Sequence, residues 1–243
     1  ANDNLSGICV TAFLGRWLGD LPERRYTYRI LFIPETIGSI FYLSRHLEAM
    51  KANTVAGFVV TCVGDERSYS FVPTRLGDTV ADKVSTHVLN HHAPEFKRYS
   101  FLDRGSDERQ YCSPGVDLPV VSIMRSKYRE YPEYHTSKDN LAIVSPSGLG
   151  GSFDVLRKCI TALEHNHRYI ATVKCEPQLG KRGLFPAVSI KGSTSHVMDM
   201  MNLLAYCDGR HYLIDIADIA KVPVWRFYDI IAKLAEAKLI VEA

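Results

Sequence analysis

The sequence predicts an α/β layered domain with a largely parallel sheet, followed by a small winged-helix-like domain. In the first domain, stretches with helical apolar spacing alternate with short, nearly continuous apolar runs. Such runs are typical of strands buried on both faces of a parallel sheet. From residue 195 onward three helical patterns follow one another, with a tight turn before the last, which resembles a winged helix.

Length and composition allow one large domain plus a small one. The chain has 243 residues, of which 46% are apolar and 23% charged, so a sizeable core can form. The net charge of +2 gives no basic field for nucleic acid or a membrane surface. No apolar run approaches the roughly 20 residues of a membrane helix. Six scattered cysteines without a CxxC pair indicate reduced thiols, hence a cytoplasmic protein.

The expected elements of the first domain follow from the period of the apolar residues. Helical spacing predicts four helices, at residues 5–19, 37–47, 80–89 and 151–165. Apolar runs between them predict three strands, at residues 29–33, 55–63 and 118–124. A Gly-, Ser-, Asp- and Pro-rich stretch at residues 103–117 is expected to be a long functional loop.

Glycines and prolines suggest where the domains divide. Residues 174–193 contain three glycines and two prolines. We therefore expect an α/β domain at 1–173, a linker at 174–194 and a winged-helix-like domain at 195–243. Because the chain opens on Ala1 without an initiator Met, we also expect that the N-terminal part of the first domain is missing.

Polar residues fall at the ends of the expected strands. Glu35 follows the first strand, Asp65 ends the second, and His135 lies in the loop after the third. Asp3 immediately precedes the first helix. Since ligands bind outside the carboxyl ends of strands in open α/β sheets, these four side chains are expected at one edge. Three carboxylates and an imidazole suit a zinc site with a general base, although acidic residues at strand ends also serve as helix caps.

Four segments occur in the order found in a known superfamily. Residues 1–7 (ANDNLSG), 34–39 (PETIGS), 105–119 and 134–139 (YHTSKD) resemble motifs of co-catalytic zinc aminopeptidases of the bacterial leucyl aminopeptidase and glutaminyl cyclase superfamily. Bacterial aminopeptidase-like proteins of uncertain function, which end in a winged helix, are more similar still. The resemblance covers essentially the whole chain, and it implies a zinc-peptidase-like layered fold.

The resemblance implies a metal-dependent hydrolase of aminopeptidase type acting on a peptide or small amide. In that reading Asp3, Asp65 and His135 are metal ligands, and Asp3 bridges or binds zinc. Glu35 is the general base that takes a proton from the water activated by zinc. The attacking hydroxide then adds to an amide carbonyl polarised by the metal.

Two departures from the superfamily pattern concern the metals. Gly38 aligns Glu35 with the first glutamate of a Glu-Glu pair, so Thr36 replaces the second glutamate, a zinc ligand. One of the two zinc positions is thereby weakened, and a single-metal site is plausible. In the other register Glu35 is the ligand and the base is lost. The superfamily's first histidine ligand lies upstream of Asp3, where this chain has no residues.

Further side chains are candidates for the surroundings of the metal or for substrate contacts. Asp107 lies in the expected long loop, and Tyr134 precedes His135 in the matched motif. Arg109 and Tyr111, together with Arg67, could hold a substrate carboxylate, because Arg makes paired hydrogen bonds to that group. For the charged residues of the loop, such as Asp107, an exposed charge cluster without a functional role is an equally good interpretation.

The C-terminal domain favours a docking role over nucleic acid. The polar residues of its last helical segment are nearly balanced in charge: Arg226, Asp229, Lys233, Glu236 and Lys238. Few cations give little counterion release, and acidic groups repel phosphates. We expect a protein partner or self-association through this domain. Two alternatives to the hydrolase stay open, a catalytically weak or inactive binding scaffold and a DNA-binding regulator with a degenerate enzyme domain.

Overall fold

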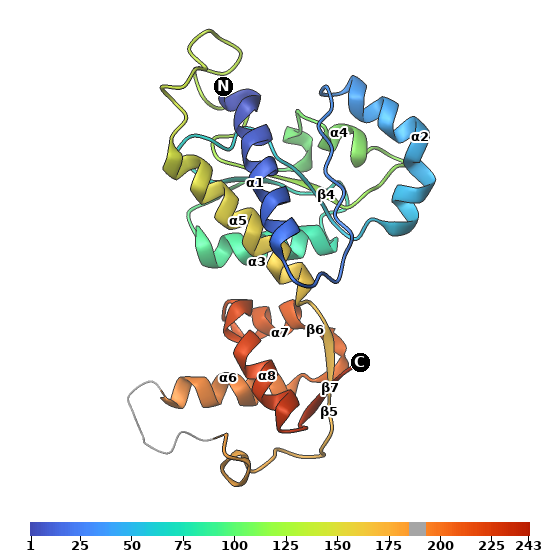
Figure 1. Ribbon diagram of the computed structural model, residues 1–243, viewed down its shortest axis with the longest axis vertical. Coiled ribbons are helices and arrows are strands. Elements are labelled where there is room, and N and C mark those ends of the chain that lie inside the picture. Colours follow the sequence, from blue (N-terminus) through green and yellow to red (C-terminus); the bar gives the residue numbers. More distant parts are fainter. Residues whose placement is uncertain (185–192) are drawn as a thin grey trace. The chain divides into compact units, whose positions relative to one another are not determined.

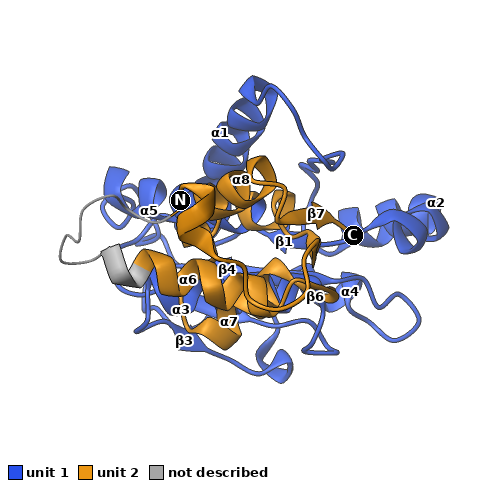
Figure 2. Cartoon of the chain, turned by 90° about the horizontal axis from the view of Figure 1, so that it is seen from below, with its two compact units in different colours: residues 1–160 blue, residues 161–243 orange. Residues whose placement is uncertain are grey.

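The chain divides into two compact units. The computed structural model describes residues 1–184 and 193–243, and contacts separate a first unit, Ala1–Ile160, from a second, Thr161–Ala243 (Figures 1 and 2). The division falls before the expected boundary at residue 173. Residues 185–192 of the expected linker lie outside the described part. No described helix is long and apolar enough to cross a membrane.

A four-stranded sheet forms the centre of the first unit. Its strands are β1 (Gly57–Val59), β2 (Ser70–Val72), β3 (Lys97–Arg98) and β4 (Val120–Met124), in the order β1-β4-β2-β3. β1 pairs with β4 and β2 pairs with β3 in parallel, whereas β2 and β4 run antiparallel. Every residue of β4 is buried, as its continuous apolar run predicts for a central strand. The expected α/β class with a mostly parallel sheet is confirmed.

Helices pack on this sheet through their apolar stripes. The helices of the first unit are α1 (Gly7–Asp20), α2 (Ile37–Asn53), α3 (Val80–His92), α4 (Glu108–Tyr111) and α5 (Pro146–Glu164). α2 and α4 share a buried cluster with the start of β4, built on Leu43, Tyr111 and Val120. α3 begins where Thr79 and Asp82 form a capping box, which satisfies two backbone N–H groups at the helix start.

The expected strand at residues 29–33 is not formed. This segment belongs to no strand in the described part of the chain, and its Ile30 and Phe32 side chains are exposed. An apolar run alone does not make a strand, because a strand also needs a neighbour for its backbone hydrogen bonds. Sequence analysis in turn missed β2 and β3, because two or three residues are too few to display a period.

The second unit combines three helices with a small antiparallel sheet. Its helices are α6 (Ser193–Ala205), α7 (Leu213–Ala220) and α8 (Tyr228–Glu236). Its strands are β5 (Arg168–Ala171), β6 (Asp208–Tyr212) and β7 (Ile240–Glu242), in the order β6-β5-β7. The three helices agree with the expected winged helix. β5 precedes the expected linker yet pairs with both other strands, and therefore the second unit begins earlier than the sequence suggested.

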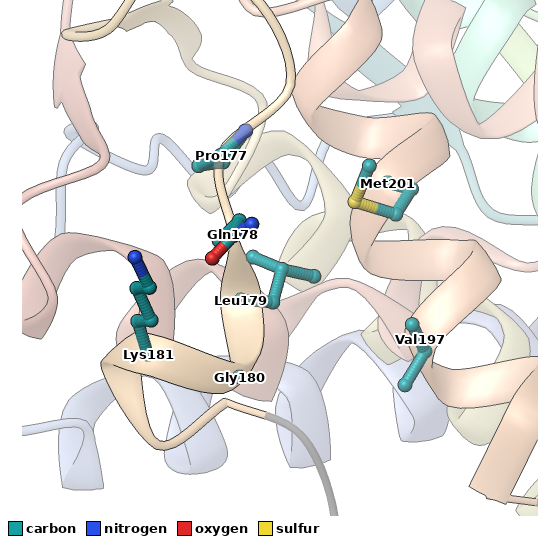
Figure 3. A pocket seen from close by; sticks show the side chains of 7 residues that line it. All are labelled: Pro177, Gln178, Leu179, Gly180, Lys181, Val197 and Met201. Atoms are coloured by element: carbon teal, nitrogen blue, oxygen red, sulfur yellow. The ribbon is translucent and has the colours of Figure 1, made fainter.

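Part of the expected linker packs onto the second unit. Residues Leu179–Arg182 form a 3₁₀ turn, and Leu179 is buried. Figure 3 shows Leu179 and Pro177 on one side of a cavity of about 350 Å³, opposite Val197 and Met201 of α6. The described portion of this segment therefore lines a largely apolar cavity together with α6.

The packing of β2 makes a testable stability prediction. Phe71 is fully buried between the flanking elements, so Phe71→Ala should lower the free energy of unfolding by about 3–5 kcal/mol. Phe13→Ala is the matched control, because Phe13 is 59% exposed and should change it by less than about 0.5 kcal/mol. Urea unfolding followed by circular dichroism measures both. Equal effects of the two substitutions would contradict the packing described.

Candidate functional site

Asp3 and His135 meet although they are far apart in the sequence. Asp3 lies in the turn Asn2–Ser6 that leads into α1, and His135 lies in the loop between β4 and α5. His135 Nε2 is 3.2 Å from Asp3 Oδ2. The His135 ring stacks on Tyr134, with ring centroids 3.9 Å apart, and is otherwise largely exposed. The backbone of His135 has a positive φ of 55°, an uncommon conformation for a residue with a side chain.

Asp139 fixes the turn that carries Asp3. Its Oδ1 accepts a hydrogen bond from the Asn2 amide at 2.6 Å, and its Oδ2 accepts one from the Asp3 amide at 3.0 Å. Asp139 and His135 belong to the same loop, so that loop both orients Asp3 and contacts its carboxylate. Sequence reasoning gave Asp139 no role. The available signal was its place at the end of the YHTSKD segment.

Glu35 lies at the start of α2, beside a cation. Arg109 Nη2 is 3.5 Å from Glu35 Oε1 and donates a hydrogen bond to Thr36 Oγ1 at 2.7 Å. Asp107 Oδ1 accepts from the Thr36 amide at 2.7 Å and from Ser39 Oγ at 2.9 Å, and thereby caps the helix. Asp107 and Arg109, two of the expected neighbours of the site, thus anchor the turn that carries Glu35.

Burial and neighbouring charges shift the pKa of both Asp3 and Glu35. Burial raises the pKa of Asp3, and the nearby Asp139 adds to this although His135 opposes it. Burial also raises the pKa of Glu35, with further contributions from the charges of Asp107 and Asp3. The pKa of Tyr134 rises to about 12, mainly through burial, and the charges of Asp3 and Glu35 add to the rise. The structure therefore joins Asp3 to His135 by a direct contact, and the charge of Asp3 acts on Glu35.

The fourth residue, Asp65, has its carboxylate occupied elsewhere. Asp65 is buried, and its Oδ2 accepts hydrogen bonds from Asn2 Nδ2 at 3.1 Å and the Ser126 amide at 2.9 Å. Its Oδ1 accepts from Ser126 Oγ at 2.8 Å and the Arg67 amide at 2.9 Å. A carboxylate offers about four acceptor positions, and all four are used. In this structure the Asp65 carboxylate therefore has no open acceptor position and joins three chain segments, while its part in metal binding stays a prediction.

Tyr111 and Arg67, two other candidates for binding a substrate carboxylate, are occupied by contacts within the fold. Tyr111 is buried in the cluster of α2, α4 and β4, and burial raises its pKa to about 12, so it offers no open contact to a substrate. Arg67 makes a paired ion contact with Glu133, with both N–O distances 2.8 Å. Neither can hold a substrate carboxylate in this arrangement.

Sequence reasoning also overlooked Cys62, a buried thiol beside the site. Burial and the charge of Asp3 raise the pKa of Cys62 to about 12, so the thiol stays protonated. Among the described residues, no three His, Cys, Asp or Glu side chains are grouped so as to hold a metal ion. Asp3 and His135 form a pair.

The network around Asp65 predicts a structural phenotype. Asp65→Ala leaves three buried donors and the partly buried Arg67 amide without an acceptor, and should lower the free energy of unfolding of the metal-free chain by about 2–4 kcal/mol. Asp78→Ala, at an exposed aspartate, is the control and should change it by less than about 0.5 kcal/mol. Urea unfolding with a chelator present measures the difference. If Asp65→Ala is as stable as the control, these hydrogen bonds contribute little and the Asp65 carboxylate is available to bind a metal ion.

Comparison with known families and structures agrees with this architecture. A family described as a domain of unknown function (DUF4910) matches residues 1–166, and a winged helix-turn-helix family matches residues 167–242. A protein of Clostridium acetobutylicum, named for polysaccharide biosynthesis and for its aminopeptidase-like domain, is 43% identical over 220 residues. That match covers 89% of this chain and 50% of the relative, so the chain spans about half of the relative's length.

Two solved structures share the fold. A crystal structure of a protein described as a peptidase from Clostridium acetobutylicum superposes with a TM-score of 0.91 and 38% identity, over 100% of this chain and 54% of that chain. An aminopeptidase from Aneurinibacillus sp. strain AM-1 gives a TM-score of 0.51 at 16% identity, over 67% of this chain and 39% of that one, and shows the fold alone. The chain therefore belongs to the DUF4910 family, with an aminopeptidase-like fold in its first unit and a winged helix-turn-helix domain in its second.

Proposed function

We propose that the first unit carries the reacting groups of an aminopeptidase-type hydrolase, which cleaves an amide bond in a peptide or small amide. The observation that supports this most directly is the contact of 3.2 Å between His135 Nε2 and Asp3 Oδ2, in a site that also holds Glu35. An imidazole, a carboxylate ligand and a second carboxylate with a raised pKa are the groups that metal-assisted hydrolysis needs.

The donor chemistry supports one cation position. Asp3 is a partly buried carboxylate whose pKa is raised, so a cation placed between Asp3 and His135 would relieve the cost of its charge. Nitrogen and oxygen donors of this kind suit zinc, which when bound supplies Lewis-acid polarisation of a carbonyl and lowers the pKa of a water towards about 7. A second position is not supported, because Thr36 accepts from Arg109 and Asp65 is fully hydrogen-bonded.

Glu35 is the proposed general base. A carboxylate with a raised pKa holds a proton more readily than an ordinary glutamate, and a base works best when its pKa approaches the working pH. Arg109, 3.5 Å from Glu35 Oε1, orients the carboxylate, and Asp107 holds the turn beneath it. Glu35 thus removes a proton from the attacking water and can return it to the leaving amine.

A binding scaffold without catalysis is the second candidate. Catalytic zinc sites use three protein ligands, and the described residues supply Asp3 and His135 only. The same acidic groups could bind the ammonium of a ligand without cleaving it. Metal content and hydrolysis together distinguish the two candidates.

For the second unit we propose protein docking or self-association in preference to nucleic acid. Arg226, which precedes α8, forms an ion pair with Asp199 of α6 and is partly neutralised. α8 itself carries Asp229 and Glu236 beside Lys233. Such a surface releases few counterions on a phosphate backbone, so its affinity for nucleic acid would be small.

Substitutions should separate metal binding from catalysis. Asp3→Ala and His135→Ala should remove zinc from a chain that otherwise carries one ion, because each deletes one of two ligands. Glu35→Gln should retain zinc and lose about 10²-fold or more of the hydrolysis of aminoacyl anilides. Plasma emission spectrometry and release of the chromophore measure the two effects. The exposed Glu95→Gln is the control. Full zinc with no hydrolysis in the wild-type chain would favour the scaffold.

The raised pKa of Glu35 predicts how stability depends on pH. Because the folded-state pKa lies above the ordinary value of 4.5, Glu35 stabilises the fold when protonated, and this contribution is lost as the pH rises through the folded pKa. In the metal-free chain, Glu35→Gln should therefore raise Tm at pH 7, where Glu35 is charged, and leave Tm nearly unchanged below pH 4.5, where Glu35 is protonated. Thermal unfolding across this range tests the sign. A lower Tm for the variant at pH 7 would contradict the charge crowding.

A further inference from the structure

Tyr131 is a buried tyrosine in the loop after β4, and the mechanism above gives it no part. Only 4% of its surface is exposed. It belongs to a buried cluster that includes Val72 of β2 and Met124 of β4. Because side chains in such a core are closely packed, the central sheet of the first unit fixes the position of the Tyr131 ring.

The hydroxyl of Tyr131 is directed at Asp139, the residue that holds the turn of Asp3. Tyr131 OH donates a hydrogen bond to Asp139 Oδ2 at 3.4 Å and lies 3.7 Å from Cys62 Sγ. Burial raises the pKa of Tyr131, so the hydroxyl keeps its proton and can donate. The same Asp139 Oδ2 accepts the Asp3 amide at 3.0 Å. One carboxylate oxygen therefore joins the Tyr131 hydroxyl to the backbone of Asp3.

The ring of Tyr131 is linked to His135 in a similar way. It meets the Tyr134 ring edge-on, with centroids 5.6 Å apart and an angle of 75° between the planes. Tyr134 in turn stacks on His135, with centroids 3.9 Å apart and an angle of 16°. Both arrangements are favourable for aromatic rings. Tyr131 is thus one residue away from Asp3 through its hydroxyl and one residue away from His135 through its ring.

We propose that Tyr131 is a positioning residue, which sets the geometry of the Asp3–His135 pair and so prepares it to bind a cation. Residues that hydrogen-bond to the groups around a metal ligand, or pack against it, fix its orientation and thereby raise metal affinity. The effect on metal binding rests on the proposed function, whereas the ordering of the two side chains by Tyr131 can be measured without metal.

A matched pair of substitutions tests the effect on metal binding in the full 243-residue chain. Tyr131→Phe keeps the ring and removes the hydroxyl. Tyr128→Phe is the control, because Tyr128 is buried in the same cluster but its hydroxyl donates to Glu108 Oε1 at 2.7 Å. Tyr131→Phe should raise the Kd for zinc by about tenfold or more, and Tyr128→Phe by less than about twofold. Isothermal titration of the metal-free chains with zinc measures both.

Two measurements on the metal-free chain test the ordering itself. Hydrogen exchange of the Asp3 amide should be about fivefold faster in Tyr131→Phe than in the wild type, because Asp139 loses one of its donors. The NMR signals of the His135 ring, assigned by their loss in His135→Gln, should keep their positions in Tyr131→Phe and shift in Tyr131→Leu. Only the second substitution removes the ring contact with Tyr134. Circular dichroism checks that Tyr131→Leu is folded.

The outcomes separate the proposed function from the role of Tyr131. A wild-type chain that binds no zinc overturns the proposed function, and the metal-free measurements then decide whether Tyr131 orders the pair. The role of Tyr131 is overturned if Tyr131→Phe has the Asp3 exchange rate and the zinc affinity of the wild type. It is also overturned if Tyr128→Phe changes both quantities as much, because the effect would then be a general loss of stability.

Discussion

The buried carboxylate of Asp65 is the contact on which the candidate site depends. It joins Asn2, at the entry to α1, to Ser126, just after β4, and to the chain after β1. Neither oxygen meets a formal positive charge from a side chain; neutral donors satisfy both, which is how a buried carboxylate can remain stable. Asn2 Oδ1 also accepts a hydrogen bond from the Gly64 amide at 2.7 Å. The turn that carries Asp3 is therefore held against the chain that follows β1.

The carboxylates of Asp3 and Glu35, unlike that of Asp65, lie in surroundings that disfavour their charged forms. Burial raises the pKa of Asp3 and of Glu35. The charge of Asp139 adds to the rise at Asp3 and those of Asp107 and Asp3 add to it at Glu35, whereas His135 and Arg109 oppose it only in part. Asp65 shows the contrast, since a structural carboxylate is surrounded by donors. Asp65 therefore differs from Asp3 and Glu35 in how far its carboxylate is satisfied by hydrogen bonds.

Sequence reasoning located much of the site, and the reasons for its errors are physical. Asp3, Glu35 and His135 were expected at one rim; Asp3 and His135 are in contact, and the strand expected before Glu35 is not formed in the described part of the chain. The hydrogen bonds that occupy Asp65 could not be predicted, because they depend on Asn2 and Ser126, which are remote in sequence. Asp139 was missed because its partners are backbone amides, which carry no residue signature. Short strands such as β3 and β5 were not predicted, because they are too short to show the two-residue alternation of a strand.

The apolar pattern of α1 explains why periodicity alone could not identify its buried face. The spacing that predicted the helix ran through Ile8 and Phe13, whereas the first unit buries Val10 and Leu14. Both sides are apolar, so the helix was predicted correctly while its orientation stayed ambiguous. Each Å² of apolar surface that stays in water forgoes about 25 cal/mol of the stabilisation that burial would give. The helical period therefore identifies the helix, whereas the buried face is set by the packing of Val10, Leu14 and Leu18 within the first unit.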